Sequence, residues 1–157
     1  GGIEPHTSTM AREIAGREFA LYLFEGTKSK SNFSDLHLRS RNFDEPRCVE
    51  LVEKAQTVVA VHGKEEERDM VEVGGLDHEL ADGIVERLEN AGFTADRDRM
   101  SSTSGTHRAN ICNQTTTGKG IQLEIYRSLR DRLGKGPANE LERFAEAVRG
   151  AISNSLG

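Results

Sequence analysis

The chain has 157 residues, of which 35% are apolar, and this is enough for one domain with a hydrophobic core. Its 21 basic and 26 acidic side chains give a formal charge of −5, which argues against a protein built mainly to hold nucleic acid or anionic lipid. No run of residues has the apolar length that spans a bilayer, and no basic-then-apolar leader opens the chain. We therefore expect a cytoplasmic protein with no nucleic-acid or membrane partner.

The first residue and the cysteines carry two further expectations. The chain opens on Gly1 rather than Met, which indicates a processed product or a fragment of a longer polypeptide. Cys48 and Cys112 lack the CxxC spacing of thiolate metal sites, so we expect core thiols rather than a disulfide or a metal centre.

Local patterns predict the elements of the first part of the chain. Ser8 is a typical helix cap, and Pro46 lies in the first turn of a helix, where its missing N–H costs little. In chain order we expect a helix over 8–17, a buried strand over 19–24, an exposed loop over 27–34, a helix from a cap at 44–46 to 55, and a strand over 57–62.

The second part of the chain continues the alternation. The predicted elements are a short strand over 70–73, a helix from a cap at Asp77 to about Gly92, a strand over 93–95, a long polar loop over 96–118, a strand over 121–126 and a closing helix over 138–152. Strands that alternate with helices indicate an α/β fold with a largely parallel sheet, in which sites gather at the carboxyl ends of strands.

Three ionisable residues stand at strand ends or strand-loop boundaries. Glu124 interrupts the apolar run 120–125, where a buried carboxylate is costly unless it has a role. His62 ends an apolar strand and precedes a glycine, and Glu4 lies in a Gly/Pro turn. Two carboxylates and an imidazole in such places suggest one metal-hydrolase site, while a hydrogen-bonded core histidine and a solvated glutamate remain the simpler interpretation.

Seven blocks, in order along the chain, resemble the phage-type poly-γ-glutamate hydrolases. They are Gly-Gly-Ile-Glu-Pro-His-Thr-Ser (1–8), Leu-Tyr-Leu-Phe-Glu-Gly (21–26), Leu-His-Leu-Arg-Ser-Arg-Asn-Phe-Asp-Glu-Pro (36–46), Val-His-Gly (61–63), Val-Gly-Gly-Leu-Asp (73–77), Asn-Ile-Cys-Asn (110–113) and Gly-Lys-Gly-Ile-Gln-Leu-Glu-Ile (118–125). The resemblance implies a fold like that of a trimmed zinc carboxypeptidase: a single three-layer α/β domain with a mixed, largely parallel sheet.

The resemblance also implies the chemistry of the site. In that family two His and one Glu hold one zinc ion, and a separate Glu is the general base. Glu4 and His62 fall on metal-ligand positions and Glu124 on the base, so Zn²⁺ is the expected cofactor. The first metal His would precede Gly1, so we expect a hydrolase-like domain over 1–157 that lacks its N-terminal strand. His6 is an alternative third ligand, since residues two apart in an extended segment point to the same side.

An anionic polypeptide, poly-γ-glutamate, is the substrate that the resemblance implies. The expected substrate-binding residues are Arg39, Arg41, Asn110, Asn113, Gln114 and Arg127, and Lys119 and Arg130 are further basic candidates. Gln114 departs from the family, in which an Arg tends to follow the Asn-Ile-x-Asn block, and this puts the substrate in doubt because an amide cannot match a carboxylate charge.

Two alternative functions follow from these departures. The first is a zinc amidohydrolase that acts on another acyl amino acid. The second is a non-catalytic phage or prophage accessory module that keeps the fold without a complete metal site. A phage origin also leaves open that the protein is released with phage rather than kept in the cytoplasm.

Overall fold

The computed structural model describes residues 2–157, with the side chain of Phe33 left aside. Four strands form one sheet in the order β1-β4-β2-β3: β1 (Val59–Lys64), β2 (Val71–Gly75), β3 (Ala95–Arg97) and β4 (Ile121–Tyr126). β1 is parallel to β4 and β2 is parallel to β3, whereas β2 and β4 are antiparallel. The sheet is therefore mixed and largely parallel, which confirms the expected fold class.

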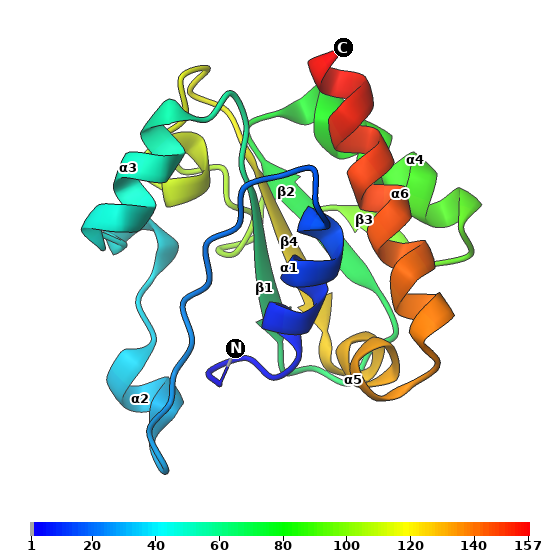
Figure 1. Cartoon of the computed structure of the whole chain (residues 1–157), viewed down its shortest axis with the longest axis horizontal. Coiled ribbons are helices and arrows are strands. Elements are labelled where there is room, and N and C mark those ends of the chain that lie inside the picture. The colour runs from blue at the N-terminus through cyan, green and yellow to red at the C-terminus, as the bar shows by residue number, and fades with distance from the viewer. Residues whose placement is uncertain (1) are drawn as a thin grey trace.

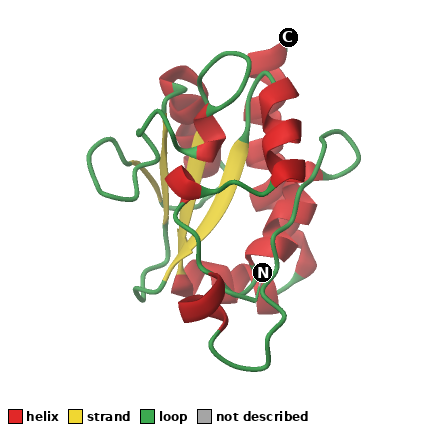
Figure 2. Cartoon of the chain, turned by 90° about the vertical axis from the view of Figure 1, so that its left-hand side faces the viewer, coloured by secondary structure: helices red, strands yellow, loops and turns green. Residues whose placement is uncertain are grey.

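Helices cover the sheet unequally. They are α1 (Thr7–Ala15), α2 (Asn32–Leu36), α3 (Pro46–Lys54), α4 (His78–Asn90), α5 (Arg127–Lys135) and α6 (Ala138–Leu156), with 3₁₀ turns η1 (Ser40–Asn42) and η2 (Ile111–Asn113). Figure 1 shows α1, α4 and α6 on one side of the sheet and α3 on the other, and in the turned view of Figure 2 the long helices gather on one side of the strands. Among residues 2–157, no helix is both long and apolar enough to cross a membrane.

β4 divides its side chains between the core and a polar face. Ile121, Leu123 and Ile125 are fully buried in the hydrophobic core, which the long helices share. The intervening residues, Gln122 and Glu124, point to the opposite face because successive side chains of a strand alternate. The polar loop that follows β3 packs over that second face, where Gln122 donates to the carbonyl of Thr103.

Local signals in the sequence explain the helix starts. Asp77 caps α4 by accepting a hydrogen bond from the Leu80 N–H at 3.2 Å. Glu45 caps α3 in the same way, through the Cys48 N–H at 2.9 Å, and Pro46 occupies the first turn. Both caps fall where the sequence predicts them.

The prediction of a buried strand over 19–24 is wrong. This segment is irregular and lies outside the sheet, and its apolar side chains pack locally instead: Phe43 meets Tyr22 and Phe24 edge to face, at centroid distances of 6.3 and 5.5 Å. Together with β1 and α3, the segment lines an apolar cavity of about 500 Å³. The apolar run therefore forms one wall of this cavity and is not a strand of the sheet.

Candidate active site

His62, Glu124 and Glu72 lie in one row across three strands. His62 on β1 is the register partner of Glu124 on β4, and Glu124 is in turn the partner of Glu72 on β2. Directly opposed residues of neighbouring strands project from the same face. The row therefore places an imidazole and two carboxylates side by side on the polar face of the sheet.

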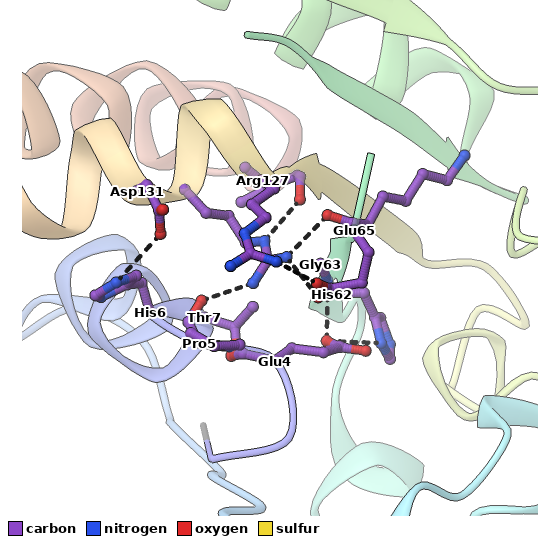
Figure 3. Close-up of polar contacts among 12 residues, drawn as sticks. Glu4, Pro5, His6, Thr7, His62, Gly63, Glu65, Arg127 and Asp131 are labelled. Atoms are coloured by element: carbon purple, nitrogen blue, oxygen red, sulfur yellow. Dashed lines mark hydrogen bonds and ion pairs between the residues drawn. The ribbon is translucent and has the colours of Figure 1, made fainter. Parts of the chain in front are cut away.

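Glu4 reaches this row from the turn that precedes α1. Its Oε2 accepts a hydrogen bond from the Gly63 N–H at 2.9 Å and lies 3.7 Å from Nδ1 of His62. On the other side of the ring, Nε2 of His62 is 3.3 Å from Oγ of Ser40. Figure 3 shows the Glu4 carboxylate pointing toward the ring of His62 and the backbone of Gly63. The structure thus brings together two residues that are 58 positions apart in the sequence.

Glu4 and His62 shift each other's pKa toward the charged forms. Burial alone would raise the pKa of Glu4, but the hydrogen bond and charge of His62 outweigh it and hold that pKa below its ordinary value. Burial would likewise lower the pKa of His62, and Glu4 reverses this and raises it. Each residue of the pair therefore favours the charged form of the other.

Glu124 has a different environment. The residue is 6% exposed, and burial raises its pKa to about 7, although the charges of His62 and Lys64 oppose the rise. Its Oε1 accepts a hydrogen bond from Nε2 of Gln122 at 2.8 Å. A carboxyl group with a pKa near neutrality exchanges protons readily at physiological pH, as a general base must.

Asn110 and Asn113 lie behind Glu124 and hold the surrounding polar groups in place. Asn110 Nδ2 donates to Oε1 of Gln122 at 2.8 Å, so an amide chain runs from Asn110 through Gln122 to Glu124. Asn113 Nδ2 donates to the carbonyl of Gly105 at 2.7 Å and holds the loop above the sheet. Both side chains are buried and bond to the protein itself.

The other predicted substrate residues are at the surface. Arg39 and Arg41 are exposed and flank Ser40, the residue that contacts His62. Gln114 is exposed and donates to the carbonyl of Arg108. Arg127, at the start of α5, lies 3.1 Å from Glu65 and 3.7 Å from Glu67 in exposed ion pairs.

Two further basic candidates are not placed to meet a substrate beside Glu124. Arg130 is 1% exposed and donates to protein acceptors only within the described residues. Lys119 is exposed but precedes the first residue of β4, five residues before Glu124 or roughly 16 Å along an extended strand. Their charge alone suggested a role at the site. The burial of Arg130 and the distance of Lys119 from Glu124 do not support that role.

Sequence reasoning missed a second polar cluster on the same face. The Tyr126 hydroxyl donates to Oε1 of Glu72 at 3.0 Å, and the Lys64 ammonium bonds the other carboxylate oxygen of Glu72. Lys64 Nζ also lies 5.2 Å from the centre of the Tyr126 ring. The alternation of Gln122, Glu124 and Tyr126 with buried aliphatic residues was the available signal, since it marks a polar face.

Glu4 and His62 supply two donors of the kinds that zinc prefers, a carboxylate oxygen and an imidazole nitrogen. Within residues 2–157, no group of three or more His, Cys, Asp or Glu side chains is arranged to hold a metal ion. His6 does not join the pair, because its Nε2 lies 3.5 Å from Asp131 on α5. Figure 3 shows His6 turned toward Asp131 and away from His62.

Known proteins resemble this chain in sequence and in fold. The family model for poly-gamma-glutamate hydrolase matches residues 1–143. The UPF0714 protein YndL of Bacillus subtilis (strain 168) is 42% identical over 134 residues, which are 85% of this chain and 52% of that protein. The SPbeta prophage-derived UPF0714 protein YoqZ of the same strain is 41% identical over 126 residues, 80% of this chain and 45% of that protein. The chain therefore spans about half the length of these curated relatives.

Two solved structures share the fold. One is described as a bacteriophage poly-gamma-glutamate hydrolase; it matches with a TM-score of 0.92 and 31% identity over 100% of this chain and 81% of that one. The other is described as YNDL-apo (Zinc-free) and matches with a TM-score of 0.91 and 37% identity over 99% of this chain and 81% of that one.

Proposed function

Because the chain belongs to the poly-gamma-glutamate hydrolase family, we propose that it is the core of a zinc-dependent enzyme that cleaves the amide bonds of poly-γ-glutamate. The observation that carries the proposal is the convergence of Glu4, His62 and Glu124. Two of them form a close pair with the donor atoms of a zinc site, and the third is a buried carboxyl group with a raised pKa beside that pair.

The Glu4 and His62 pair fits a zinc ion. Tetrahedral coordination at about 2.0 to 2.2 Å places neighbouring ligand atoms roughly 3 to 4 Å apart, and Oε2 of Glu4 is 3.7 Å from Nδ1 of His62. Ser40 at Nε2 would fix the orientation of the ring, as outer partners of metal-bound histidines do. A third ligand would come from outside residues 2–157, and the family resemblance puts it in a Pro-His segment upstream of Gly1.

Zinc, when bound, would polarise the scissile carbonyl and make a bound water more acidic. Glu124 would take the proton of the attacking water and pass it to the leaving amine. Its burial, which raises its pKa in the metal-free protein, suits both transfers, because the group must first accept and then release a proton. Gln122 would hold the carboxyl group in place through its 2.8 Å hydrogen bond while the proton moves.

The substrate proposed is γ-linked polyglutamate, whose free carboxylates need nearby positive charge. Arg39 and Arg41 support this because they are exposed and flank the Ser40 contact to His62. Arg127 is exposed as well, but its ion pairs with Glu65 and Glu67 would have to open. We assign the substrate carboxylates to Arg39 and Arg41 first.

A zinc amidohydrolase for another acyl amino acid is the second candidate. Gln114 favours it, since this position carries an uncharged amide that already bonds the carbonyl of Arg108. A non-catalytic accessory module is the third, and it fits the prophage origin of the relative YoqZ. The prophage origin of YoqZ also supports a phage-related protein, acting in the cytoplasm or after release with phage.

The test compares substrates and metals in one experiment. The protein, prepared with its natural upstream sequence, is assayed on γ-linked polyglutamate, on α-linked polyglutamate and on a set of N-acyl amino acids, with zinc present and after chelation. Cleavage of the γ-linked polymer alone, lost on chelation and restored by zinc, supports the first proposal. Cleavage of other acyl amides supports the second, and a folded protein without turnover in any arm supports the accessory module.

A further inference from the structure

We propose that Arg130 is a positioning residue that fixes the segments carrying Glu4, His62 and Glu124 relative to one another. The inference rests on the proposed function for the roles of those three residues. The geometry comes from the backbone: the guanidinium of Arg130 donates hydrogen bonds to main-chain carbonyls that lie within two residues of each of them.

Three carbonyl groups from separate segments meet at this guanidinium. Arg130 Nε donates to the carbonyl of Ile125 at 3.0 Å, which is the residue after Glu124. Nη1 donates to the carbonyl of Pro5 at 2.8 Å, which follows Glu4. Nη2 donates to the carbonyl of Lys64 at 2.8 Å, two residues beyond His62.

An arginine at this position costs folding free energy, because its charge is buried. Its side chain is buried, and among the described residues its carboxylate partner is Glu65, which is largely exposed, at 3.1 Å. A buried cation whose other partners are neutral carbonyls adds little net stability compared with a well-packed apolar side chain. A planar guanidinium does, however, hold several acceptors in fixed directions, which an ammonium group or an aliphatic side chain cannot do.

Gly63 makes room for the guanidinium of Arg130. A Cβ at this position would lie 2.6 Å from Nε and Cζ of Arg130, so only a glycine lets the guanidinium reach the carbonyls. The Gly63 N–H in turn donates to Oε2 of Glu4 at 2.9 Å. Figure 3 shows Pro5, Gly63 and Glu65 converging on the space between the N-terminal turn and the end of β1.

A purely structural clamp is the alternative, and the chain contains a matched example. Arg149 on α6 donates to the carbonyls of Glu13 and Ile14 at 2.6 and 3.2 Å and so ties α6 to the end of α1. Like Arg130, it holds main-chain carbonyls from a distant segment. Its acceptors lie at the far end of α1 from Glu4, so its loss should lower stability without changing the site.

The experiment compares Arg130→Lys with Arg149→Lys in the protein that carries its natural upstream sequence. Three quantities are measured: the melting temperature in chelator, the zinc dissociation constant by competition with a chromophoric chelator, and the exchange rate of the Gly63 amide relative to that of Leu123. Gly63→Ala is the second variant, since it displaces the guanidinium while leaving Arg130 in place. If Arg130→Lys does not fold, Gly63→Ala is compared with Arg149→Lys by zinc dissociation constant and melting temperature alone, because its own glycine amide is lost; zinc binding equal to that of Arg149→Lys would then overturn the inference.

We expect Arg130→Lys to weaken zinc binding by about 10- to 100-fold, the usual effect of losing a residue that orients metal ligands. The amide exchange rate of Gly63 should rise more than that of Leu123, because the turn that carries Glu4 loses the hydrogen bond from Arg130 to the Pro5 carbonyl. Arg149→Lys should lower the melting temperature and leave both site measurements at the wild-type values. If both lysine variants alter the site alike, or if neither does, Arg130 is only a clamp.

Failure of the proposed function gives a different result. A wild-type protein that binds no zinc and hydrolyses none of the substrates would refute the zinc enzyme. Exchange at Gly63 is measured in chelator and so needs no bound zinc, which means that a selective increase in Arg130→Lys would still establish that Arg130 sets the placement of Glu4. An unchanged Gly63 rate would overturn the inference whatever the enzyme assays show.

Discussion

His62 and Glu124 stand directly opposite each other on the parallel strands β1 and β4, so their side chains leave the same face of the sheet. Glu72 faces Glu124 from the other neighbouring strand. The two carboxylates are given different partners: Glu72 bonds the Lys64 ammonium and the Tyr126 hydroxyl, whereas Glu124 bonds an amide. Such a division of partners leaves one carboxylate neutralised by a cation and the other available to exchange a proton.

Replacing Glu124 separates catalysis from metal binding. In the zinc-complete protein, Glu124→Gln should reduce amide hydrolysis by about two to four orders of magnitude, the usual contribution of a positioned proton-transfer group. Zinc content and melting temperature should change little, because the amide is nearly isosteric and Glu124 is not a ligand. Glu67→Gln, which changes an exposed carboxylate in the same way, is the matched control and should remain active.

A structural role for Glu124 predicts the reverse outcome. If Glu124 balanced the charge of a cation such as Arg127, the same substitution would mainly lower stability. Arg127 is instead paired with Glu65 and Glu67. Activity within a few-fold of the wild type, together with a clear fall in melting temperature, would reject the catalytic role.

The raised pKa of Glu124 predicts a pH dependence of stability in the metal-free protein. Because burial raises its pKa from 4.5 to about 7, the folded state holds the proton more tightly than the unfolded state. This contribution to the free energy of unfolding is complete below about pH 4.5 and is lost as the pH rises through about 7. Its size is on the order of 3 kcal/mol.

Glu124→Gln removes this titration, so the variant should gain stability relative to the wild type as the pH rises from 4.5 to 8. Denaturant titrations of both proteins in chelator at several pH values measure the difference. Comparing the two proteins cancels the titrations of groups remote from Glu124. His62 adds to the measured difference, because the charge of Glu124 helps to raise the pKa of His62. A difference that does not vary with pH would show that Glu124 is not protonated near neutrality.

Much of the fold was accessible from the sequence because its signals are local. The caps at Glu45 and Asp77 and the alternation in β4 depend on residues a few positions apart, and the helices and strands they predict are confirmed. The strand prediction for residues 19–24 was wrong because apolar residues with high strand propensity can pack against a neighbour such as Phe43 instead of joining a sheet. Helix α5 was missed because its many charged residues hide the buried pair Leu129 and Leu133.

Local sequence signals likewise revealed some residues of the site and not others. Glu124 and His62 could be singled out because an ionisable residue in an apolar strand is unusual. Glu72 and Lys64 could not, since their meaning depends on the register of β1, β4 and β2, which no local pattern fixes. The role of Arg130 was hidden for a further reason: its acceptors are main-chain carbonyls, and these carry no sequence signal.

Removing either proposed ligand, by Glu4→Gln or His62→Gln, should weaken zinc binding strongly. Ser40→Ala removes only an outer partner of His62 and should weaken zinc binding by about 10-fold.

A version of the protein extended upstream to include the Pro-His segment should bind zinc more tightly than the 157-residue chain, because two ligands do not make a three-ligand catalytic site. Metal analysis after dialysis measures both. Equal affinity of the two versions would show that another group completes the site.

The last prediction concerns the loop that packs over the polar face. Gly74 is the register partner of Gln122, and a Cβ on Gly74 would lie 1.9 Å from the carbonyl oxygen of Ser104. Gly74→Ala must therefore displace the backbone that brings Thr103 to Gln122, and with it the support of Glu124. We expect a loss of stability of about 1 to 3 kcal/mol and a fall in kcat, with zinc affinity unchanged because Glu4 and His62 lie on other elements.

Gly83 on α4 provides the matched control. A Cβ there meets no atom within 4 Å, so Gly83→Ala should leave kcat unchanged and raise stability by about 0.5 to 1 kcal/mol through helix propensity. Denaturant unfolding and steady-state kinetics of the two alanine variants give the comparison. If Gly74→Ala keeps the wild-type kcat, the loop does not position Glu124, and the carboxyl group must be held by the sheet alone.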